Sequence, residues 1–215
     1  MKLTAKIVSW LTIPLLTPMY ALLVVFFVPG QSKSMRLLDA LYFYPWEAKA
    51  LFLLLFLVFI FVAPGMSLLV LKVNRSISSV EVPNQYERET PILIMAFYSL
   101  VLYLFLLYQS DTNVVPSLIL AMALGGLIAS VIAFFLNKIL KVSLHGIGLG
   151  ALIGFLFAYF LTLQDFELNI LIFSIILAGI GLSSRLYLKQ HNLIEILVGF
   201  SLGFVSQFFS IYFYP

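Results

Sequence analysis

The chain has no cysteine among its 215 residues, so it contains no disulfide framework. Charged residues are also scarce: they make up 10% of the sequence, whereas a soluble domain carries about 25%. This scarcity excludes bulk water as the main solvent of the chain. The formal net charge is only +3 and the basic residues form no run, so we expect no nucleic acid partner.

Hydrophobic residues make up 63% of the sequence and stand in continuous runs of about 20 residues. In a bilayer every backbone N–H and C=O group must be paired within the protein, which leaves helices or closed barrels. Runs of this length are typical of membrane helices, because barrel strands are shorter and alternate in polarity. The sequence therefore predicts an all-α integral membrane protein. We expect a polytopic bundle of about seven (six to seven) transmembrane helices that forms a single domain over residues 1–215.

Seven spans are expected, and the first is the least regular. Lys2 and Lys6 precede an apolar stretch as in a signal peptide, but no small-x-small cleavage site follows, so we interpret the stretch as a retained span. Prolines predict kinks in the first span, at Pro14 and Pro18, and in the second, at Pro64-Gly65. The expected spans cover residues 7–28, 49–71, 91–108, 115–136, 145–163, 168–184 and 192–213.

The segment between the first two spans, Gly30 to Trp46, is amphipathic and aromatic. Aromatic side chains of this kind usually lie at the level of the lipid headgroups. A helix in the membrane interface is therefore expected here.

Glycines recur at a spacing of four residues in two of the later spans. The fifth span contains Gly146, Gly150 and Gly154, and the seventh contains Gly199 and Gly203. This spacing favours close packing of two helices. A phosphate-binding loop around Gly146-x-Gly148-x-Gly150 is the weaker alternative, because no strand precedes it.

Only two histidines occur, His145 and His191, and each stands at the start of a hydrophobic span near a basic residue and a serine. Glu195 is one helical turn from His191, so it can accept a hydrogen bond from one ring nitrogen. The other nitrogen would then be free to act as a nucleophile. Arg185 offers a planar set of donors that suits phosphate oxygens, and its charge places it near the interface or in a wet cavity.

Ser184-Arg185, His191 and Glu195 have the spacing S-R-x5-H-x3-E, which resembles the third signature of the type 2 phosphatidic acid phosphatase superfamily, S-R-x5-H-x3-D. This superfamily contains the lipid phosphate phosphatases and is related to the vanadium haloperoxidases. The second signature, P-S-G-H, is matched by the serine and histidine of Val142-Ser143-Leu144-His145. The first, K-x6-R-P, is matched least, by Arg88 and a nearby proline, with Glu81 in place of the lysine. The resembling region covers about residues 84–203.

The resemblance implies a membrane phosphatase that hydrolyses a lipid phosphate, either a monoester or a diphosphate, without a metal or another cofactor. It implies that His191 attacks phosphorus to form a phosphohistidine and that Glu195 orients His191. His145 would protonate the departing lipid alcohol and then activate water. The phosphate-binding side chains that the resemblance implies are Arg185, Arg88 and Ser143.

Each polar residue also has a structural alternative that the sequence leaves open. Ser143 can cap a helix, and Glu195 can be an acid favoured by a helix N-terminus. Arg88 can be a loop charge, and Lys141 can be a phosphate contact or an ordinary boundary lysine, of which we favour the latter. The alternative function is a catalytically decayed relative that binds lipid or takes part in transport. An unrelated small transporter is less supported, because charged residues are absent from the middle of the spans.

Topology provides an internal check, because the three clusters follow the second, fourth and sixth expected spans and so lie on one membrane face. If the N-terminus is cytoplasmic, the excess of Lys and Arg on that face favours a cytoplasmic site. The resemblance to bacterial enzymes instead implies a periplasmic site and a bacterial inner membrane.

The expected partners are a lipid-linked phosphate and membrane lipids; the sequence leaves the lipid and the oligomeric state open.

Overall fold

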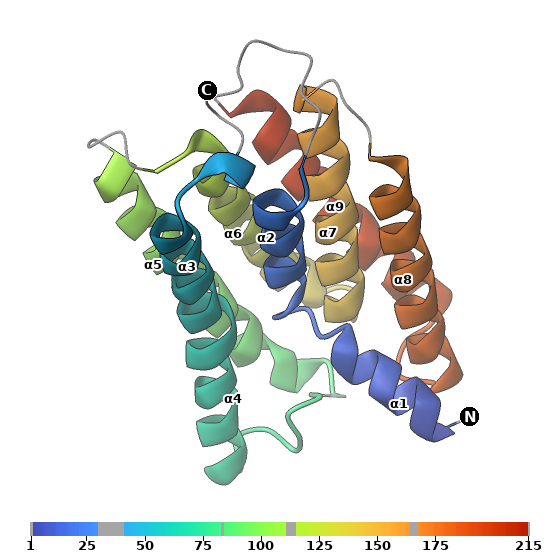
Figure 1. The fold of residues 1–215 in the computed structure, drawn as a ribbon. Helices are drawn as coiled ribbons and strands as arrows, with labels where there is room; N and C mark the ends of the chain where they lie inside the picture. The colour runs from blue at the N-terminus through green and yellow to red at the C-terminus, as the bar shows by residue number, and fades with distance from the viewer. Residues whose placement is uncertain (1, 30–40, 83, 111–114, 164–166, 215) are drawn as a thin grey trace.

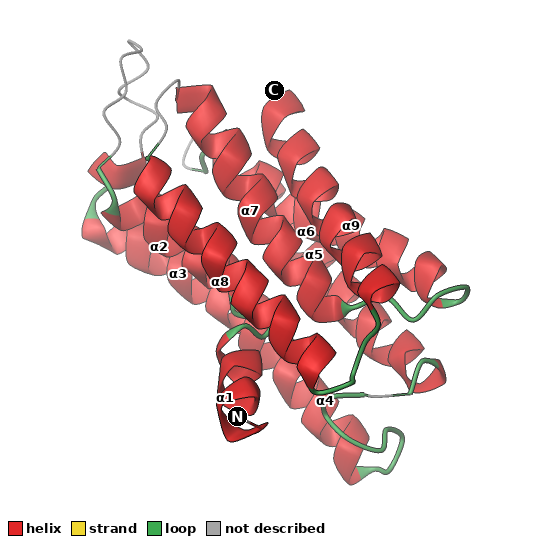
Figure 2. Ribbon diagram, turned by 90° about the vertical axis from the view of Figure 1, so that its right-hand side faces the viewer, coloured by secondary structure: helices red, strands yellow, loops and turns green. Residues whose placement is uncertain are grey.

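A computed structural model describes residues 2–29, 41–82, 84–110, 115–163 and 167–214, and every regular element in these ranges is a helix (Figure 2). Six of them are long and apolar enough to cross a membrane: Trp46–Val73, Tyr86–Ser110, Ser117–Asn137, Leu144–Leu163, Leu168–Tyr187 and Leu193–Phe213. The prediction of an all-α polytopic bundle is confirmed. The chain is an integral membrane protein.

The prediction of one continuous first span over residues 7–28 is wrong. The structure divides it into α1 (Lys2–Leu11) and α2 (Thr17–Phe27), joined by a turn at Pro14. Pro14 has no N–H to continue the first helix, whereas Pro18 lies in the first turn of α2, where a missing donor costs nothing. With 11 residues, α2 is about 16 Å long, which is shorter than the hydrocarbon core of a bilayer.

The second span is a composite helix, in which a wider π-helical turn precedes the proline. It consists of α3 (Trp46–Phe56), the π-helix η3 (Leu57–Val62) and α4 (Ala63–Val73). The N–H of Ala63 donates to the carbonyl of Val58, five residues earlier. This wider turn stands directly before Pro64, where we expected a kink.

The expected interface helix between the first two spans lies mostly outside the described residues. Of the segment from 30 to 46, the structure describes residues 41–46, which include a short 3-10 helix, η2 (Leu41–Phe43).

The central helix of the bundle is α7 (Leu144–Leu163), which packs against α2, α6 (Ser117–Asn137), α8 (Leu168–Tyr187) and α9 (Leu193–Phe213). The 3-10 helix η4 (Tyr86–Arg88) leads into α5 (Glu89–Ser110), which packs against α6. The apolar core lies between these helices and includes Leu22, Phe26, Phe52, Leu102, Ile119 and Phe155.

Glycines bring the backbones of α7 and α9 into contact, which confirms the helix-packing prediction. A Cβ atom added at Gly146 would lie 2.9 Å from the carbonyl oxygen of Ile196, and one added at Gly203 would overlap the carbonyl oxygen of Ile147. The glycines lie inside α7, so a phosphate-binding loop around Gly148 is excluded. This packing fixes the start of α7 against the start of α9.

One end of the bundle carries all three sequence clusters. Figure 1 shows the end of α4, the starts of α5, α7 and α9, and the end of α8 at the same end as the N-terminus, whereas the C-terminus lies at the opposite end. The segments that contain Arg88, His145 and His191 are therefore neighbours in space.

Candidate functional site

His191 is held against the end of α8 by a tight turn. Lys189 adopts a left-handed conformation with φ of 54°, and the N–H of Gln190 donates to the carbonyl of Arg185 over 3.1 Å. These are the features of a Schellman turn, which reverses the chain after a helix. As a result His191, which is buried, follows α8 after a turn of only three residues and precedes the first turn of α9.

Glu195 contacts both His191 and the N-terminus of α9. Its Oε2 atom lies 2.6 Å from Nδ1 of His191. Asn192 is the N-cap of α9: its side chain accepts a hydrogen bond from the N–H of Glu195 over 2.9 Å, and the Glu195 carboxylate accepts from Asn192 in return. Glu195 is therefore the acid of a capping box and at the same time the partner of His191.

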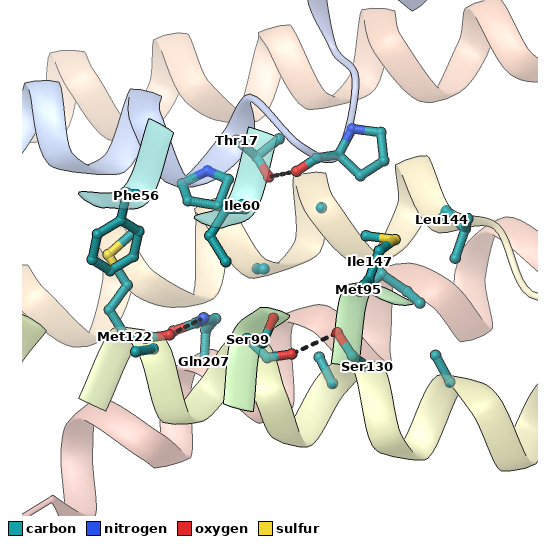
Figure 3. Close-up of a pocket in the computed structure, with 18 of the residues that line it drawn as sticks. Thr17, Phe56, Ile60, Met95, Ser99, Met122, Ser130, Leu144, Ile147 and Gln207 are labelled. Atoms are coloured by element: carbon teal, nitrogen blue, oxygen red, sulfur yellow. Dashed lines mark hydrogen bonds between the residues drawn. The ribbon is translucent and has the colours of Figure 1, made fainter. Parts of the chain in front are cut away.

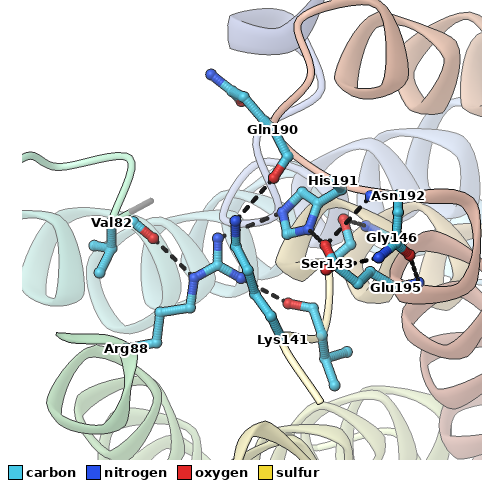
Figure 4. Close-up of polar contacts among 10 residues, drawn as sticks. Val82, Arg88, Lys141, Ser143, Gly146, Gln190, His191, Asn192 and Glu195 are labelled. Atoms are coloured by element: carbon cyan, nitrogen blue, oxygen red, sulfur yellow. Dashed lines mark hydrogen bonds and ion pairs between the residues drawn. The ribbon is translucent and has the colours of Figure 1, made fainter. Parts of the chain in front are cut away.

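Arg88 is buried, and its guanidinium points at the other side of the His191 ring (Figure 4). Its Nε donates to the carbonyl of Val82 and its Nη1 to the carbonyl of Val142, each over 2.8 Å. Its Nη2 lies 3.4 Å from Nε2 of His191. Two backbone carbonyls thus orient Arg88, one from the preceding loop and one from the connection between α6 and α7. This excludes the interpretation of Arg88 as an ordinary solvated loop charge.

These contacts define the proton positions on His191. Because a guanidinium only donates hydrogen bonds, Nε2 of His191 is the acceptor, and Nδ1 carries the proton that is donated to Glu195. Burial, followed by the positive charges of Arg88, Arg185 and Lys141, lowers the pKa of His191 below its usual 6.5. The ring is therefore neutral at pH 7, with a lone pair on Nε2.

Arg185 and His145 are joined through Ser9, a residue of α1. Nη1 of Arg185 donates to the hydroxyl of Ser9 over 2.7 Å, and Nε2 of His145 lies 3.1 Å from the carbonyl oxygen of Ser9. Arg185 is buried, and its Nε has no partner within the part of the chain that the structure describes. A buried guanidinium with a free donor is suited to bind an anion.

Ser143 acts as a cap in the structure. Its Oγ accepts a hydrogen bond from the N–H of Gly146 over 3.1 Å, and its own N–H donates to the carbonyl of Glu195 over 3.2 Å. The capping alternative is therefore correct, and the backbone N–H of Ser143 also ties the start of α7 to α9. The hydroxyl hydrogen remains available as a donor.

Positive charge is in excess around His191. Among the described residues, only His191 and Glu195 lie within ion-pair distance of each other, and because the His191 ring is neutral this contact is a hydrogen bond. The charged groups of Arg88, Arg185 and Lys141 therefore have no carboxylate partner in these ranges. Unpaired cations in a partly buried site are costly unless an anion binds between them.

Comparisons with models of protein families, with curated proteins and with solved structures find no match. The residues of the site come from α1, η4, the connection between α6 and α7, the first turn of α7, the end of α8 and the start of α9.

The sequence did not indicate three contributors to the site: Ser9, Asn192 and Val82. Asn192-x-x-Glu195 follows the pattern of a capping box, so its role could have been predicted. Val82 has a left-handed φ of 44°, which is strained for a β-branched residue, and its carbonyl holds Arg88. No sequence pattern marks Ser9, because it meets the site only through the turn between α1 and α2.

A cavity of about 90 Å³ lies between α2, η3, α5, α6, α7 and α9 (Figure 3). Its lining is mostly apolar and includes Leu144 and Ile147, which flank His145 and Gly146 in α7. Gln207 also lines it, and the Oε1 atom of this buried side chain has no partner among the described residues. The cavity thus begins beside the first turn of α7 and extends into the bundle.

Proposed function

We propose that this protein is a membrane phosphatase that removes phosphate from a lipid phosphate through a phosphohistidine intermediate. The observation that carries the proposal is His191: a buried, neutral imidazole oriented by Glu195, near three cations that have no carboxylate partner in the described part of the chain. The likeness of the motif spacing to the type 2 phosphatidic acid phosphatase superfamily supports the same chemistry.

The proposed first step forms a bond between Nε2 of His191 and phosphorus and breaks the bond between phosphorus and the lipid oxygen. The phosphate would enter where Nη2 of Arg88 now contacts His191, so that Arg88 exchanges the ring for a phosphate oxygen. Glu195 would stabilise the positive charge that develops on the ring. The free Nε donor of Arg185 would bind a second oxygen.

His145 would supply the proton that the departing lipid alkoxide needs. In the second step the same side chain would take a proton from water, whose oxygen attacks phosphorus. The bond between phosphorus and Nε2 of His191 then breaks, which releases inorganic phosphate and restores the neutral ring. Proton transfers of this kind contribute about a hundredfold to ten-thousandfold to a rate. The carbonyl of Ser9 would hold the His145 ring in place during both steps.

The site lies at one end of the bundle, the level at which lipid headgroups lie, so a lipid phosphate can reach it from the membrane (Figure 1). The hydrocarbon part of the substrate would lie against the apolar helices, and the cavity beside Leu144 and Ile147 offers apolar surface next to the site.

The proposal is tested by phosphate release from a panel of lipid phosphates, measured on purified protein in EDTA. We expect the wild-type protein to release phosphate in a vanadate-sensitive reaction. His191→Ala protein should release none, although its thermal stability is unchanged. Lipid binding by the wild-type protein without release of phosphate from any member of the panel would instead identify the catalytically decayed alternative.

A further inference from the structure

Lys141 lies in the connection between α6 and α7, where the sequence favoured an ordinary boundary lysine. The structure turns this side chain toward the site: its Nζ donates to the carbonyl of Gln190 over 2.9 Å, directly before His191 (Figure 4). An ammonium group has three donors, so two remain available. The side chain is partly buried and lies beside the guanidinium of Arg88 (Figure 4).

The charged groups that face Lys141 come from three elements. Arg88 at the end of η4 and Arg185 near the end of α8 repel its positive charge, and Glu195 of α9 attracts it. The carboxylate of Glu195 is already bound to His191 and Asn192. Glu195 therefore attracts Lys141 through its charge but forms no direct ion pair with it.

The sum of charges shows what Lys141 adds. Arg88, Arg185 and Lys141 are three positive groups, and Glu195 is one negative group. A second carboxylate, that of exposed Glu81, binds the side-chain amide of Gln190 at the rim. With both carboxylates counted, the sum is one positive charge with Lys141 and zero without it.

We propose that Lys141 is a phosphate-binding residue and that it gives this site its preference for a dianionic phosphate monoester over a monoanionic diester. The inference rests on the proposed function, whose phosphate site it completes. A phosphate monoester carries between about one and a half and two negative charges at pH 7, because its second pKa is about 6. A diester carries one, so the third cation matters most for the monoester.

The test measures binding of methyl phosphate and dimethyl phosphate to the full chain by calorimetry in EDTA at pH 8. Wild-type protein binds methyl phosphate more tightly. Lys141→Met lowers this preference on the order of tenfold, the value of a hydrogen bond between charged groups, and Lys141→Arg keeps it. The matched control is Lys138→Met, which removes the same charge from an exposed side chain stacked over Phe134 and Phe135.

A second readout does not depend on the folding of Lys141→Met. Burial, followed by the charges of Arg88 and Arg185, lowers the pKa of Lys141 below 10.5. The preference for methyl phosphate therefore declines at alkaline pH in the wild type, starting at a lower pH than that at which an ordinary lysine loses its charge. It persists in Lys141→Arg, since a guanidinium stays charged. An equal decline in both proteins, or an unchanged preference in Lys141→Met, overturns the role of Lys141.

The outcomes separate this inference from the proposed function. If the wild-type protein hydrolyses a lipid phosphate but Lys141→Met keeps the wild-type preference for methyl phosphate, the proposed function stands and the role of Lys141 is wrong. If the preference for methyl phosphate depends on Lys141 but no lipid in the panel releases phosphate, Lys141 binds phosphate and the proposed hydrolysis is wrong. Wild-type protein that binds neither probe overturns the inference about Lys141, and release of phosphate from the lipid panel then decides the proposed function independently.

Discussion

The carboxylate of Glu195 lies 2.6 Å from Nδ1 of His191 and also completes the capping box of α9 with Asn192. One acid thus begins a membrane helix and holds the tautomer of the proposed nucleophile. A shift of the start of α9 would therefore also move the His191 ring, so the position of Nε2 is fixed by the packing of this helix.

Glu195→Gln separates the two roles of this acid, because glutamine still serves in a capping box but carries no charge. We expect little change in the midpoint of thermal unfolding. The rate constant kcat for a lipid phosphate should fall by about a hundredfold or more, because the charge that forms on His191 loses its counter-charge.

The matched control is Asn192→Ala, which removes the cap but leaves the contact between His191 and Glu195. It should cost about 1 kcal/mol of stability and keep most of the activity. Loss of stability without loss of activity in Glu195→Gln would show that the acid serves only the helix.

The pH profile of kcat/KM reports the charge of His191 in the free enzyme. The neutral form is the nucleophile, and its pKa is lowered by burial and by the neighbouring cations. The acid limb of the profile, which His191 sets, should therefore lie below pH 6.5. Lys141→Met, which removes one of those cations, should move the acid limb to higher pH. An acid limb at or above pH 6.5 in the wild type would contradict the buried site.

Arg185→Lys keeps the charge at the end of α8 and loses the planar set of donors. Because lysine cannot hold Ser9 and a phosphate oxygen in the same geometry, activity should fall by about a hundredfold while the protein still folds. Arg75→Lys, at an exposed position, is the control and should have no effect. Near-full turnover in Arg185→Lys would show that Arg185 only helps to orient the protein in the membrane and does not bind phosphate.

Gly203→Ala tests the packing that aligns α7 with α9. Its Cβ would overlap the carbonyl oxygen of Ile147, so the helices must move apart, at a cost of about 1 to 3 kcal/mol. Gly179→Ala is the matched control: its Cβ meets nothing within 4 Å, and helix propensity makes the change neutral or stabilising by up to about 1 kcal/mol. Unfolding in detergent measures both, and equal stabilities would contradict the close approach.

Much of the fold could be predicted from the sequence, because long apolar runs have one solution in a bilayer. The six later spans were placed to within a few residues. The first span failed because two prolines four residues apart allow either a kinked helix or a break, and tertiary contacts choose between them. Here Gly148 of α7 packs against Pro14, which favours the break.

The topology predicted that the three clusters share one end of the bundle, but individual contacts in the site were predictable only where the residues are one helical turn apart. The spacing of His191 and Glu195 predicted their contact, whereas the approach of Arg88 to His191 depends on packing across 103 residues. The contact of Lys141 with Gln190 was missed for the same reason: nothing near Lys141 in sequence shows that the segment before α9 lies beside its ammonium group. Ser9 reaches Arg185 only because the first span is broken.

The most direct test of the proposed chemistry is to locate the phosphoryl group during turnover. Wild-type and His145→Ala proteins would be given an aryl phosphate, quenched in alkali because phosphohistidine is acid-labile, and digested for mass spectrometry. We predict a phosphoryl group on His191, with a larger fraction in His145→Ala, because that variant retains a readily departing aryl group but lacks the side chain that activates water. Turnover with no phosphoryl group on His191 in either protein, or with one on another residue, would contradict the mechanism.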